Sequence, residues 1–359
     1  MGKLHVILSG ARSAQSKDPP ALLAGRKIRG ILRLRPLGFA QDDILFCHEI
    51  YYEVTDMITP KPLYPGARVA LVAPASAVPE EKLAPALALV KALGMEPVPY
   101  PSCYYANRDG YFAATDAQRA ADLNDAFADP SIDGVWCVRG GYGAHRLQPL
   151  LDAETIRRNP KWFGGYSDIT ALHLFLNQVC GLETYHCTMP STEPDPDEYT
   201  LSYLKKALFG GLSGELTYPA SGKPAILVPG IAEGTLCGGN LSLIVTSIGT
   251  PWEIDTKGKI LFLEDVGEKT YRIDSMLTQL RNAGKLDDCA GILLGAWTDC
   301  PPEIPERTLT LEEIFHQLIV PTGKPTLMGI PCGHCAVTAA LPMGRTCRLD
   351  AVNGSFTLA

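Results

Sequence analysis

Short apolar runs alternate with helical patterns over much of this chain, and that alternation limits the possible folds more than any other feature. Strands are predicted at ARVALVAPAS (67–76), MEPVPY (95–100), DGVWCVRGGYG (133–143) and WFGGYS (162–167). Helices are predicted between them, at 80–94 and 116–130, where apolar residues recur at helical spacing. Such alternation predicts an α/β fold with a parallel sheet, whose functional loops lie beyond the carboxyl ends of the strands.

Composition excludes several classes of protein. The chain has 359 residues, 46% of them hydrophobic and 20% charged, which is typical of one large or two ordinary globular domains. A net charge of −7 provides no general attraction to nucleic acid or to anionic membranes. No apolar run approaches the ~18 residues that a membrane span needs. The 11 cysteines have irregular spacing, which favours reduced thiols in a cytoplasm over a disulfide framework.

The first 60 residues differ from the rest of the chain. Up to position 40 they contain one acid, Asp18, against eight basic residues: Lys3, Arg12, Lys17, Arg26, Lys27, Arg29, Arg33 and Arg35. Such a segment suits a transit peptide or a nucleic-acid-binding arm. We favour a simpler interpretation, an extension of doubtful order or upstream sequence joined by a mistaken start. Met57 would then be a natural first residue.

The segment FGGYSDITALHLFL (163–176) places a serine where a predicted strand meets a predicted helix. Ser167 would therefore lie at the carboxyl edge of the sheet, and Gly164 and Gly165 would allow close backbone approach. A nucleophile elbow has this arrangement, with the next backbone N–H helping to form an oxyanion hole. The simpler alternative is that Ser167 or Asp168 only caps the helix, and this stretch alone favours the cap.

A serine nucleophile needs a histidine base. His173 lies six residues along the same helix and should point elsewhere, and His316 is predicted on a helix surface. His145 and His186 border loops and remain candidates. His334, in GIPCGHCAVTAALPMG, follows a strand end and opens an irregular loop, a setting that presents a side chain to a cleft.

A base of this kind usually needs an orienting acid, and KILFLEDVGE (259–268) offers Glu264 on a predicted strand. Alternation puts Ile260, Phe262 and Glu264 on one face and Asp265 on the other. A carboxylate aligned with core residues is costly unless it is paired, and a histidine N–H is a natural partner. The alternative is an acid that simply ends a strand.

Two further motifs suggest other chemistry. Cys332 and Cys335 form CGHC, a disulfide-isomerase motif, but neither the preceding IP nor the following AVTAALPMG predicts the long helix of a thioredoxin-like unit. As a zinc half-site it lacks a second Cys/His pair. RGGYG (139–143) is neither of the phosphate-loop patterns, and HExxH is absent from the sequence.

Several motifs in the same order resemble the LD-carboxypeptidases, also called muramoyltetrapeptide carboxypeptidases. They are RGGYGAHRLQPLLD, GGYSDITALHLFL, GTLCGGNLSLIVTSIGTPW, GKILFLEDVGEKTYRIDSMLTQLRNAG, GILLGAW and GIPCGHCAVTAALPMG. The resemblance runs from about Tyr64 to the C-terminus. It leaves out the first 60 or so residues, and the cysteines beside His334 depart from the family pattern.

The resemblance implies a serine peptidase with a Ser-Glu-His triad. The family's motifs fall on Ser167, Glu264 and His334 of this chain, and its oxyanion donors on the backbone N–H groups of Asp168 and Gly141. The fold it implies is an N-terminal parallel-sheet domain (61–190), similar to class I glutamine amidotransferases. A linker (191–230) and a C-terminal β-rich α/β domain (231–359) follow. A homodimer is also implied, with no cofactor and no metal.

The implied reaction is release of terminal D-Ala from cytoplasmic murein tetrapeptides during peptidoglycan recycling, at the amide between an L-centre and a D-residue. A positively charged group is expected near the carboxylate of the leaving residue. The alternative in the same family is a microcin-type peptidyl-nucleotide peptidase, whose pattern differs after the acid from EDVGEKTYRIDSMLTQLR. Two alternatives from other classes are a non-catalytic muropeptide-binding protein and a thiol oxidoreductase acting through CGHC.

Overall fold

A computed structural model describes residues 33–37, 45–49, 57–104, 110–192, 195–220 and 222–359. The chain divides into two compact units, Met1–Glu53 and Val54–Ala359. In the first unit, β1 (Arg33–Leu37) pairs antiparallel with β2 (Leu45–Glu49). The rest of the predicted 1–60 extension lies outside the described residues, apart from its last four, 57–60. All the other elements belong to the second unit.

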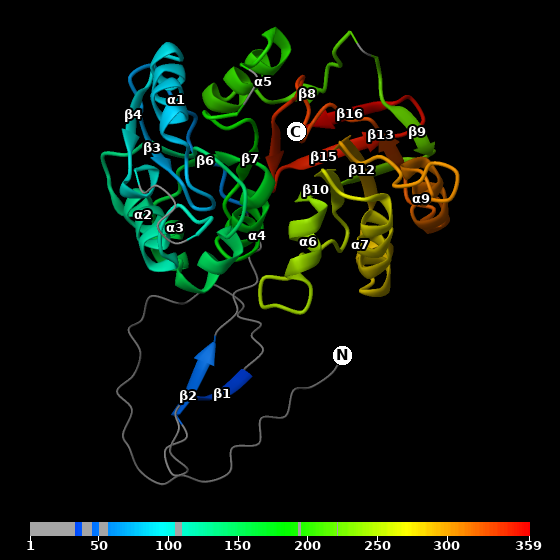
Figure 1. Cartoon of the computed structure of the whole chain (residues 1–359), viewed down its shortest axis with the longest axis horizontal. Coiled ribbons are helices and arrows are strands. Elements are labelled where there is room, and N and C mark those ends of the chain that lie inside the picture. Colours follow the sequence, from blue (N-terminus) through cyan, green and yellow to red (C-terminus); the bar gives the residue numbers. More distant parts are fainter. Residues whose placement is uncertain (1–32, 38–44, 50–56, 105–109, 193–194, 221) are drawn as a thin grey trace. The chain divides into compact units, whose positions relative to one another are not determined.

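The second unit contains a six-stranded sheet made mostly of the predicted N-terminal strands (Figure 1). In spatial order these are β14 (Leu341–Met343), β7 (Thr184–His186), β6 (Trp162–Gly165), β5 (Gly134–Cys137), β3 (Arg68–Val72) and β4 (Glu96–Pro99). Every pairing is parallel except that of β14 with β7. Because β14 comes from the end of the chain, it joins the loop after His334 to this sheet.

Helices cover both faces of this sheet. Core residues of α1 (Glu80–Ala92) and α5 (Glu198–Phe209) pack on one face. Those of α2 (Asp116–Ala128), α3 (Ala153–Arg158) and α4 (Thr170–Gln178) pack on the other. Short 3-10 segments, η1 (Pro101–Cys103), η2 (Ala144–Leu150) and η3 (Ser167–Ile169), follow the carboxyl ends of β4, β5 and β6.

The second sheet has eight strands. In spatial order they are β8 (Gly214–Glu215), β16 (Ser355–Leu358), β15 (Thr346–Asp350), β10 (Ile231–Asn240), β11 (Ile260–Val266), β12 (Gly291–Thr298), β13 (Thr326–Met328) and β9 (Ala225–Val228). The run from β10 to β13 is parallel, with antiparallel strands at both ends. Its helices include α6 (Leu241–Ser247), α7 (Thr270–Asn282) and α9 (Leu311–Leu318), which Figure 1 labels. The short helix α8 (Lys285–Asp288) follows α7, and η4 (Val320–Thr322) follows α9.

Strand β11 shows how the core joins the two sheets. Phe262 belongs to the same buried cluster as Trp162 of the first sheet, whereas Leu261 and Leu263 pack with α6, α7 and α9. Both faces of β11 therefore carry apolar residues. The alternation of side chains along this strand directs them into two different buried cores, and neither face is exposed to solvent. Each fully buried side chain of this size contributes about 1.5–3 kcal/mol, so the shared core fixes the two sheets against each other.

The predicted α/β class, with two sheets, is confirmed, and so are the type and order of the predicted elements. The strands at 67–76, 95–100, 133–143, 162–167 and 259–268 contain β3, β4, β5, β6 and β11. The domain limits 61–190 and 231–359, with a 191–230 linker, stay predictions. Among the described residues, no helix is long and apolar enough to cross a membrane.

Candidate active site

Ser167 lies at a sharp turn between β6 and η3, at the carboxyl edge of the first sheet. Its φ is +66°, and among the described non-glycine residues only Asp299 also has a positive φ. A left-handed backbone costs roughly 1–2 kcal/mol for a residue with a side chain. A serine kept in that conformation at a strand-to-helix joint has the geometry of a nucleophile elbow.

The alternative that Ser167 or Asp168 caps the helix is wrong. Neither η3 nor α4 receives a side-chain hydrogen bond at its N-cap, and those caps are Tyr166 and Ile169. The carboxylate of Asp168 is buried and instead accepts the backbone N–H of Ala144 at 2.7 Å. The Asp168 carboxylate therefore binds the start of η2, far away in the sequence, rather than the start of its own helix.

The glycine loop after β5 lies directly against the serine. A Cβ built on Gly140 would lie 3.0 Å from Ser167 Cβ and 3.3 Å from its Oγ, so a larger residue would crowd the hydroxyl. Gly141 has a φ of +110°, and a Cβ there would lie 2.3 Å from Ser76 Oγ. Within the described part of the chain, the Gly141 N–H donates to no protein acceptor. Two glycines thus allow a backbone donor to lie beside the predicted nucleophile.

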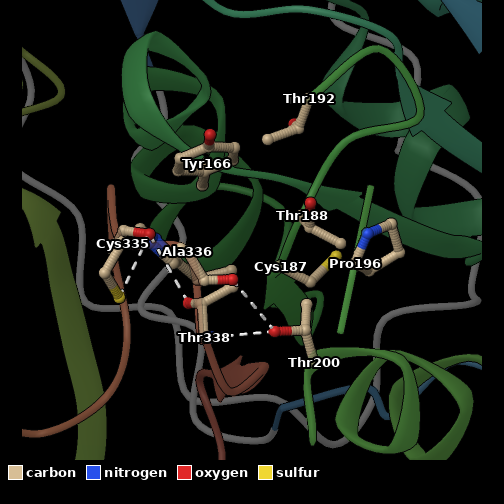
Figure 2. A pocket seen from close by; sticks show the side chains of 11 residues that line it. Tyr166, Cys187, Thr188, Thr192, Pro196, Thr200, Cys335, Ala336 and Thr338 are labelled. Carbon is tan, nitrogen blue, oxygen red and sulfur yellow. Dashed lines mark hydrogen bonds between the residues drawn. The ribbon is translucent and has the colours of Figure 1, made fainter. Parts of the chain in front are cut away.

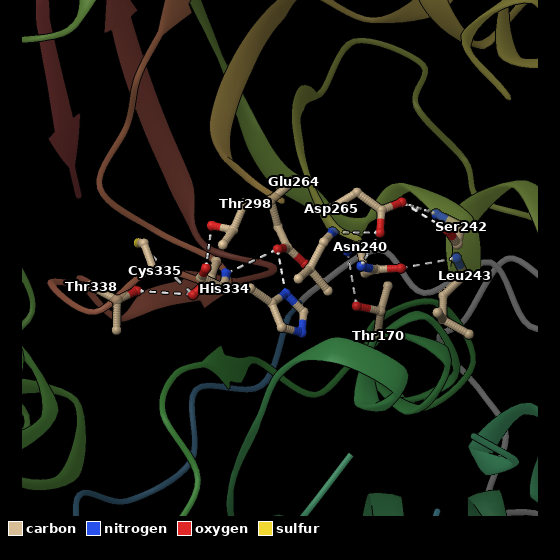
Figure 3. A network of polar contacts seen from close by, with 12 residues as sticks. Thr170, Asn240, Ser242, Leu243, Glu264, Asp265, Thr298, His334, Cys335 and Thr338 are labelled. Carbon is tan, nitrogen blue, oxygen red and sulfur yellow. Dashed lines mark hydrogen bonds and ion pairs between the residues drawn. The ribbon is translucent and has the colours of Figure 1, made fainter. Parts of the chain in front are cut away.

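Glu264 and His334 are in direct contact, as predicted. Glu264 Oε2 lies 2.7 Å from Nδ1 of His334 and also accepts the His334 backbone N–H at 3.2 Å (Figure 3). The glutamate is fully buried, whereas 15% of the histidine side chain is exposed. A carboxylate that accepts from Nδ1 leaves Nε2 as the free, basic nitrogen.

Gly333 makes this contact possible. Its φ is +119°, and a Cβ at this position would lie 2.6 Å from Glu264 Oε2. The loop is also held from β12, because Ala296 N–H donates to Cys332 O at 2.9 Å and the Thr298 hydroxyl donates to His334 O. The glycine before the histidine is thus a packing requirement that we did not predict, although the Gly-His pair is visible in the sequence.

Polar contacts beside Glu264 link the two sheets (Figure 3). The pairing of β11 with β12 shifts register between Leu263 and Asp265, so Glu264 lies at a bulge, a feature that redirects side chains beside active sites. Asp265 accepts the side-chain amide of Asn240 at 3.0 Å. The Asn240 N–H in turn donates to Thr170 Oγ1 at 3.0 Å, on the helix that follows Ser167. These bonds set the acid-bearing strand against the serine-bearing helix.

Tyr166 connects the serine with the histidine. Its ring centroid lies 4.7 Å from that of His334, and Ser167 is the next residue. Ser167 is half-buried, and no hydrogen bond joins it to His334 in the described residues. Such contacts are often loose before substrate binds. The structure therefore brings the acid and the base together, and the residue before the serine packs against the ring of the base.

The other histidines have different surroundings. His173 is buried and bonded to Thr184 and to Gly165 O, and His316 is exposed, both as predicted. His186 is fully buried, and neither of its ring nitrogens has a partner in the described structure. Burial lowers the pKa of His186 well below its usual value, which keeps the ring neutral. His145 lies against the ring of Tyr142.

The two cysteines of CGHC do not have the surroundings of a redox pair. Cys332 is fully buried and Cys335 is partly exposed, and burial raises the pKa of both thiols. Redox-active dithiols need a lowered thiol pKa and an accessible sulfur. Within the described residues, no group of three or more His, Cys, Asp or Glu side chains could hold a metal ion.

A pocket lies next to the histidine loop (Figure 2). It is lined by Tyr166, His186, Cys187, Thr188, Thr192, Pro196, Thr200, Gly333, Cys335, Ala336 and Thr338. Cys187 and Thr188 lie on one side of it and Cys335 and Ala336 on the other. The lining is mixed polar and apolar and carries no lysine or arginine, so the predicted cation for a substrate carboxylate is not among these residues.

Comparison with known protein families identifies the chain. The model of the LD-carboxypeptidase N-terminal domain matches residues 69–187, and that of the C-terminal domain matches residues 233–349. The chain belongs to the LD-carboxypeptidase family. The matched regions include Ser167, Glu264 and His334, the residues that the sequence motifs indicated.

Individual members of the family agree with this assignment. A Bacillus subtilis protein, a probable murein peptide carboxypeptidase, is 43% identical over 79% of this chain and 89% of its own length. The murein tetrapeptide carboxypeptidase of Pseudomonas aeruginosa is 34% identical over 79% of this chain and 93% of its own. The crystal structure of muramoyltetrapeptide carboxypeptidase from Oxalobacter formigenes has a TM-score of 0.71 and 29% identity, covering 81% of this chain and 98% of that one.

A second branch of the family is more distant. The microcin C7 self-immunity protein MccF of Escherichia coli is 28% identical over 70% of this chain and 80% of its own length. A structure of MccF with glutamyl sulfamoyl guanosine has a TM-score of 0.75 at 22% identity, covering 84% of this chain and 98% of that chain. That likeness shows a common fold and says nothing about substrate.

Proposed function

We propose that this protein is a serine carboxypeptidase that releases the terminal D-Ala from murein tetrapeptides. The bond cut would join the L-centre of the diamino acid to the D-residue. We further propose that it acts in the cytoplasm, in peptidoglycan recycling, and works as a homodimer. The substrate class is that in the names of the Pseudomonas and Oxalobacter relatives.

The observation that carries the proposal is the pairing of a buried acid with a histidine beside a strained serine. Glu264 holds Nδ1 of His334 at 2.7 Å, and Ser167 has a φ of +66° on the neighbouring turn. An acid on Nδ1 fixes the tautomer that leaves Nε2 able to accept a proton. A serine keeps a left-handed backbone only when the surrounding structure imposes it. At a nucleophile elbow this conformation exposes the serine Oγ, which gives the strain a function.

In the acylation step, Ser167 Oγ attacks the carbonyl carbon of the L-centre and its proton moves to Nε2 of His334. The new Oγ–C bond pushes the carbonyl electron pair onto oxygen. Collapse of this tetrahedral intermediate breaks the C–N bond, and the proton on Nε2 passes to the leaving amine of D-Ala. Glu264 stabilises the imidazolium while it exists and keeps the ring oriented.

In the deacylation step, water replaces D-Ala. His334 removes a proton from the water as its oxygen attacks the acyl carbon. Collapse then breaks the bond to Oγ, and the proton returns to Ser167, which leaves a tripeptide with a free carboxylate. No further reactant is needed.

The oxyanion of each intermediate needs two donors. The backbone N–H groups of Gly141 and Asp168 are our candidates, because one belongs to the loop packed against the serine and the other follows it directly. One such donor contributes roughly 2.7–4 kcal/mol to the transition state. The N-terminus of the following helix adds partial positive charge at the same point.

The test is mass spectrometry of synthetic tetrapeptides incubated with the whole protein. Two tetrapeptides, with meso-diaminopimelate or L-lysine at the third position, should identify the diamino acid. We expect loss of one D-Ala from at least one of them and none from Ser167→Ala. A matched peptide ending in L-Ala should remain intact. Equal release by folded Ser167→Ala would exclude the serine mechanism.

The same assay separates the alternatives. A peptidyl nucleotide added as a third substrate tests the MccF-like reaction, which the 28% identity to that protein motivates. Cleavage of the peptidyl nucleotide alone would show that the protein catalyses the MccF-like reaction instead. Tight binding of tetrapeptide without release of D-Ala by the parental protein would favour a muropeptide-binding role.

A further inference from the structure

The residue after the predicted nucleophile carries a buried carboxylate that does not cap its own helix but binds the first N–H of η2. Only 1% of Asp168 is exposed. Its Oδ2 accepts the N–H of Ala144 at 2.7 Å, across 24 positions of sequence. This bond joins the serine turn to the end of the glycine loop 139–143.

The peptide group whose N–H Asp168 binds is held at its carbonyl by a buried arginine. Arg119 of α2 is fully buried and donates to Gly143 O at 3.1 Å. The same guanidinium donates to Pro74 O and, through Nε, to Ala114 O at 3.0 Å. Arg119 thus ties together three loops at the carboxyl edge of the first sheet.

Ser76, in the loop after β3, fixes the middle of the glycine loop. Ser76 N–H donates to Gly140 O at 3.2 Å, and its hydroxyl accepts the Tyr142 N–H at 3.2 Å. Gly141 lies between these two attachment points, in close contact with Ser76. Its N–H direction therefore depends on bonds made by its neighbours, since its own N–H donates to no protein acceptor in the described chain.

We propose that the Asp168 side chain is a positioning residue for the oxyanion hole, fixing the glycine loop so that the Gly141 N–H and the Asp168 N–H point at one oxygen. The inference rests on the proposed function for the identity of the reaction. One residue would then supply a donor through its backbone and align the second donor through its carboxylate. Preorganised donors of this kind stabilise an oxyanion because they need no reorganisation during the reaction.

The chemistry of a buried carboxylate supports this role. Burial raises the pKa of Asp168, and the bond from the Ala144 backbone opposes the rise. A buried acid is costly for folding, and a residue that only had to fill this space could be apolar. A role in aligning the loop accounts for a carboxylate at this buried position.

The test compares Asp168→Ala and Asp168→Asn in the whole protein. Asparagine keeps an oxygen that can accept the Ala144 N–H, and alanine does not. Complete loss of an oxyanion donor lowers kcat about 10²–10³-fold, so misalignment by Asp168→Ala should lower it roughly 10- to 100-fold with little change in KM. Asp168→Asn should recover most of the rate and guards against failure of the alanine variant to fold.

Asp350 provides the matched control. It is also a buried carboxylate that accepts backbone N–H groups, from Val352 at 3.1 Å and Asn353 at 3.0 Å, in the turn between β15 and β16. Asp350→Ala should lower the melting temperature and leave kcat unchanged. An equal loss of kcat in both alanine variants would mean that Asp168 has only a structural role.

A readout without peptide substrate separates this inference from the proposed function. A fluorophosphonate phosphonylates an activated serine: the Oγ–P bond forms, the Oγ proton passes to Nε2 of His334, fluoride leaves, and the phosphoryl oxygen occupies the oxyanion hole. The rate of labelling at Ser167 should fall in Asp168→Ala by about the factor found for kcat and return in Asp168→Asn. Labelling of the parental protein without tetrapeptide cleavage would overturn only the proposed substrate. Parental labelling rates in folded Asp168→Ala, or no recovery in folded Asp168→Asn, would overturn the positioning role.

Discussion

One oxygen of Glu264 accepts two N–H groups of His334, that of the imidazole at 2.7 Å and that of the backbone at 3.2 Å. The carboxylate thereby fixes the ring and the loop that carries it with the same atom. Gly333 is part of the arrangement because a side chain there would collide with this oxygen. Orientation of the base and packing of the loop are thus one structural feature.

Glu264→Gln should lower kcat for D-Ala release by about 10³–10⁴-fold, measured by mass spectrometry. An amide cannot stabilise the imidazolium as a carboxylate does, and it can hold the wrong tautomer. The loss should be smaller than that of Ser167→Ala, for which roughly 10⁶-fold is typical.

Glu183→Gln is the matched control for this change. Glu183 is also buried, but it pairs with Arg345 at 2.5 Å and touches no histidine in the described structure. We expect it to reduce stability and spare kcat. A Glu264→Gln enzyme with parental kcat would exclude an orienting role for this acid.

Ser167→Gly should be more stable than Ser167→Ala, although both lack the nucleophile. Glycine adopts the +66° φ of this position without the roughly 1–2 kcal/mol that a Cβ costs there. Thermal unfolding of the two variants measures the difference. The control is Ser202, exposed within α5, where the order should reverse because glycine weakens a helix interior by about 1 kcal/mol relative to alanine. The same order at both positions would argue against strain at Ser167.

Cys332→Ser combined with Cys335→Ser should keep most of the activity. Burial raises the pKa of both thiols, so neither is a ready thiolate at neutral pH. Iodoacetamide at pH 8 should accordingly modify Cys332 far more slowly in the folded than in the unfolded chain. The variant can lose stability because Cys332 is tightly packed. A folded double variant without activity would mean that the thiols take part in the reaction.

The free energy of unfolding should fall as pH decreases from about 6.5 to about 4. Burial lowers the pKa of His173 from 6.5 to about 4 and that of His186 well below 6.5. In this window the unfolded chain binds protons that the folded chain excludes, so acid favours unfolding. Each histidine contributes up to about 1.4 kcal/mol per pH unit.

Urea titrations over this pH range measure the slope. His186→Phe should reduce this slope because it removes one of the two buried groups that bind a proton only on unfolding. Phenylalanine can keep the ring contacts with Tyr166 and Phe262, so the variant should fold. His316→Asn, at an exposed site, should leave it unchanged. Equal slopes in the parental protein and His186→Phe would contradict the assignment to His186.

Local pattern in the sequence determined the order of strands and helices, the joint at which Ser167 lies and the strand that carries Glu264. These follow from periodicity and from glycine, because they depend on neighbours a few residues apart. Family motifs selected His334 among the histidines, and its contact with Glu264 agrees.

Only the tertiary structure decided that Ser167 and Asp168 are not caps of their own helix, because the Asp168 carboxylate binds the N–H of Ala144, far away in the sequence. The tertiary structure also shows that a side chain at position 333 would collide with Glu264. It shows as well that hydrogen bonds among Thr170, Asn240 and Asp265 join the two sheets. Contacts of this kind form between segments that the chain brings together by burying one shared core, and no local pattern records them.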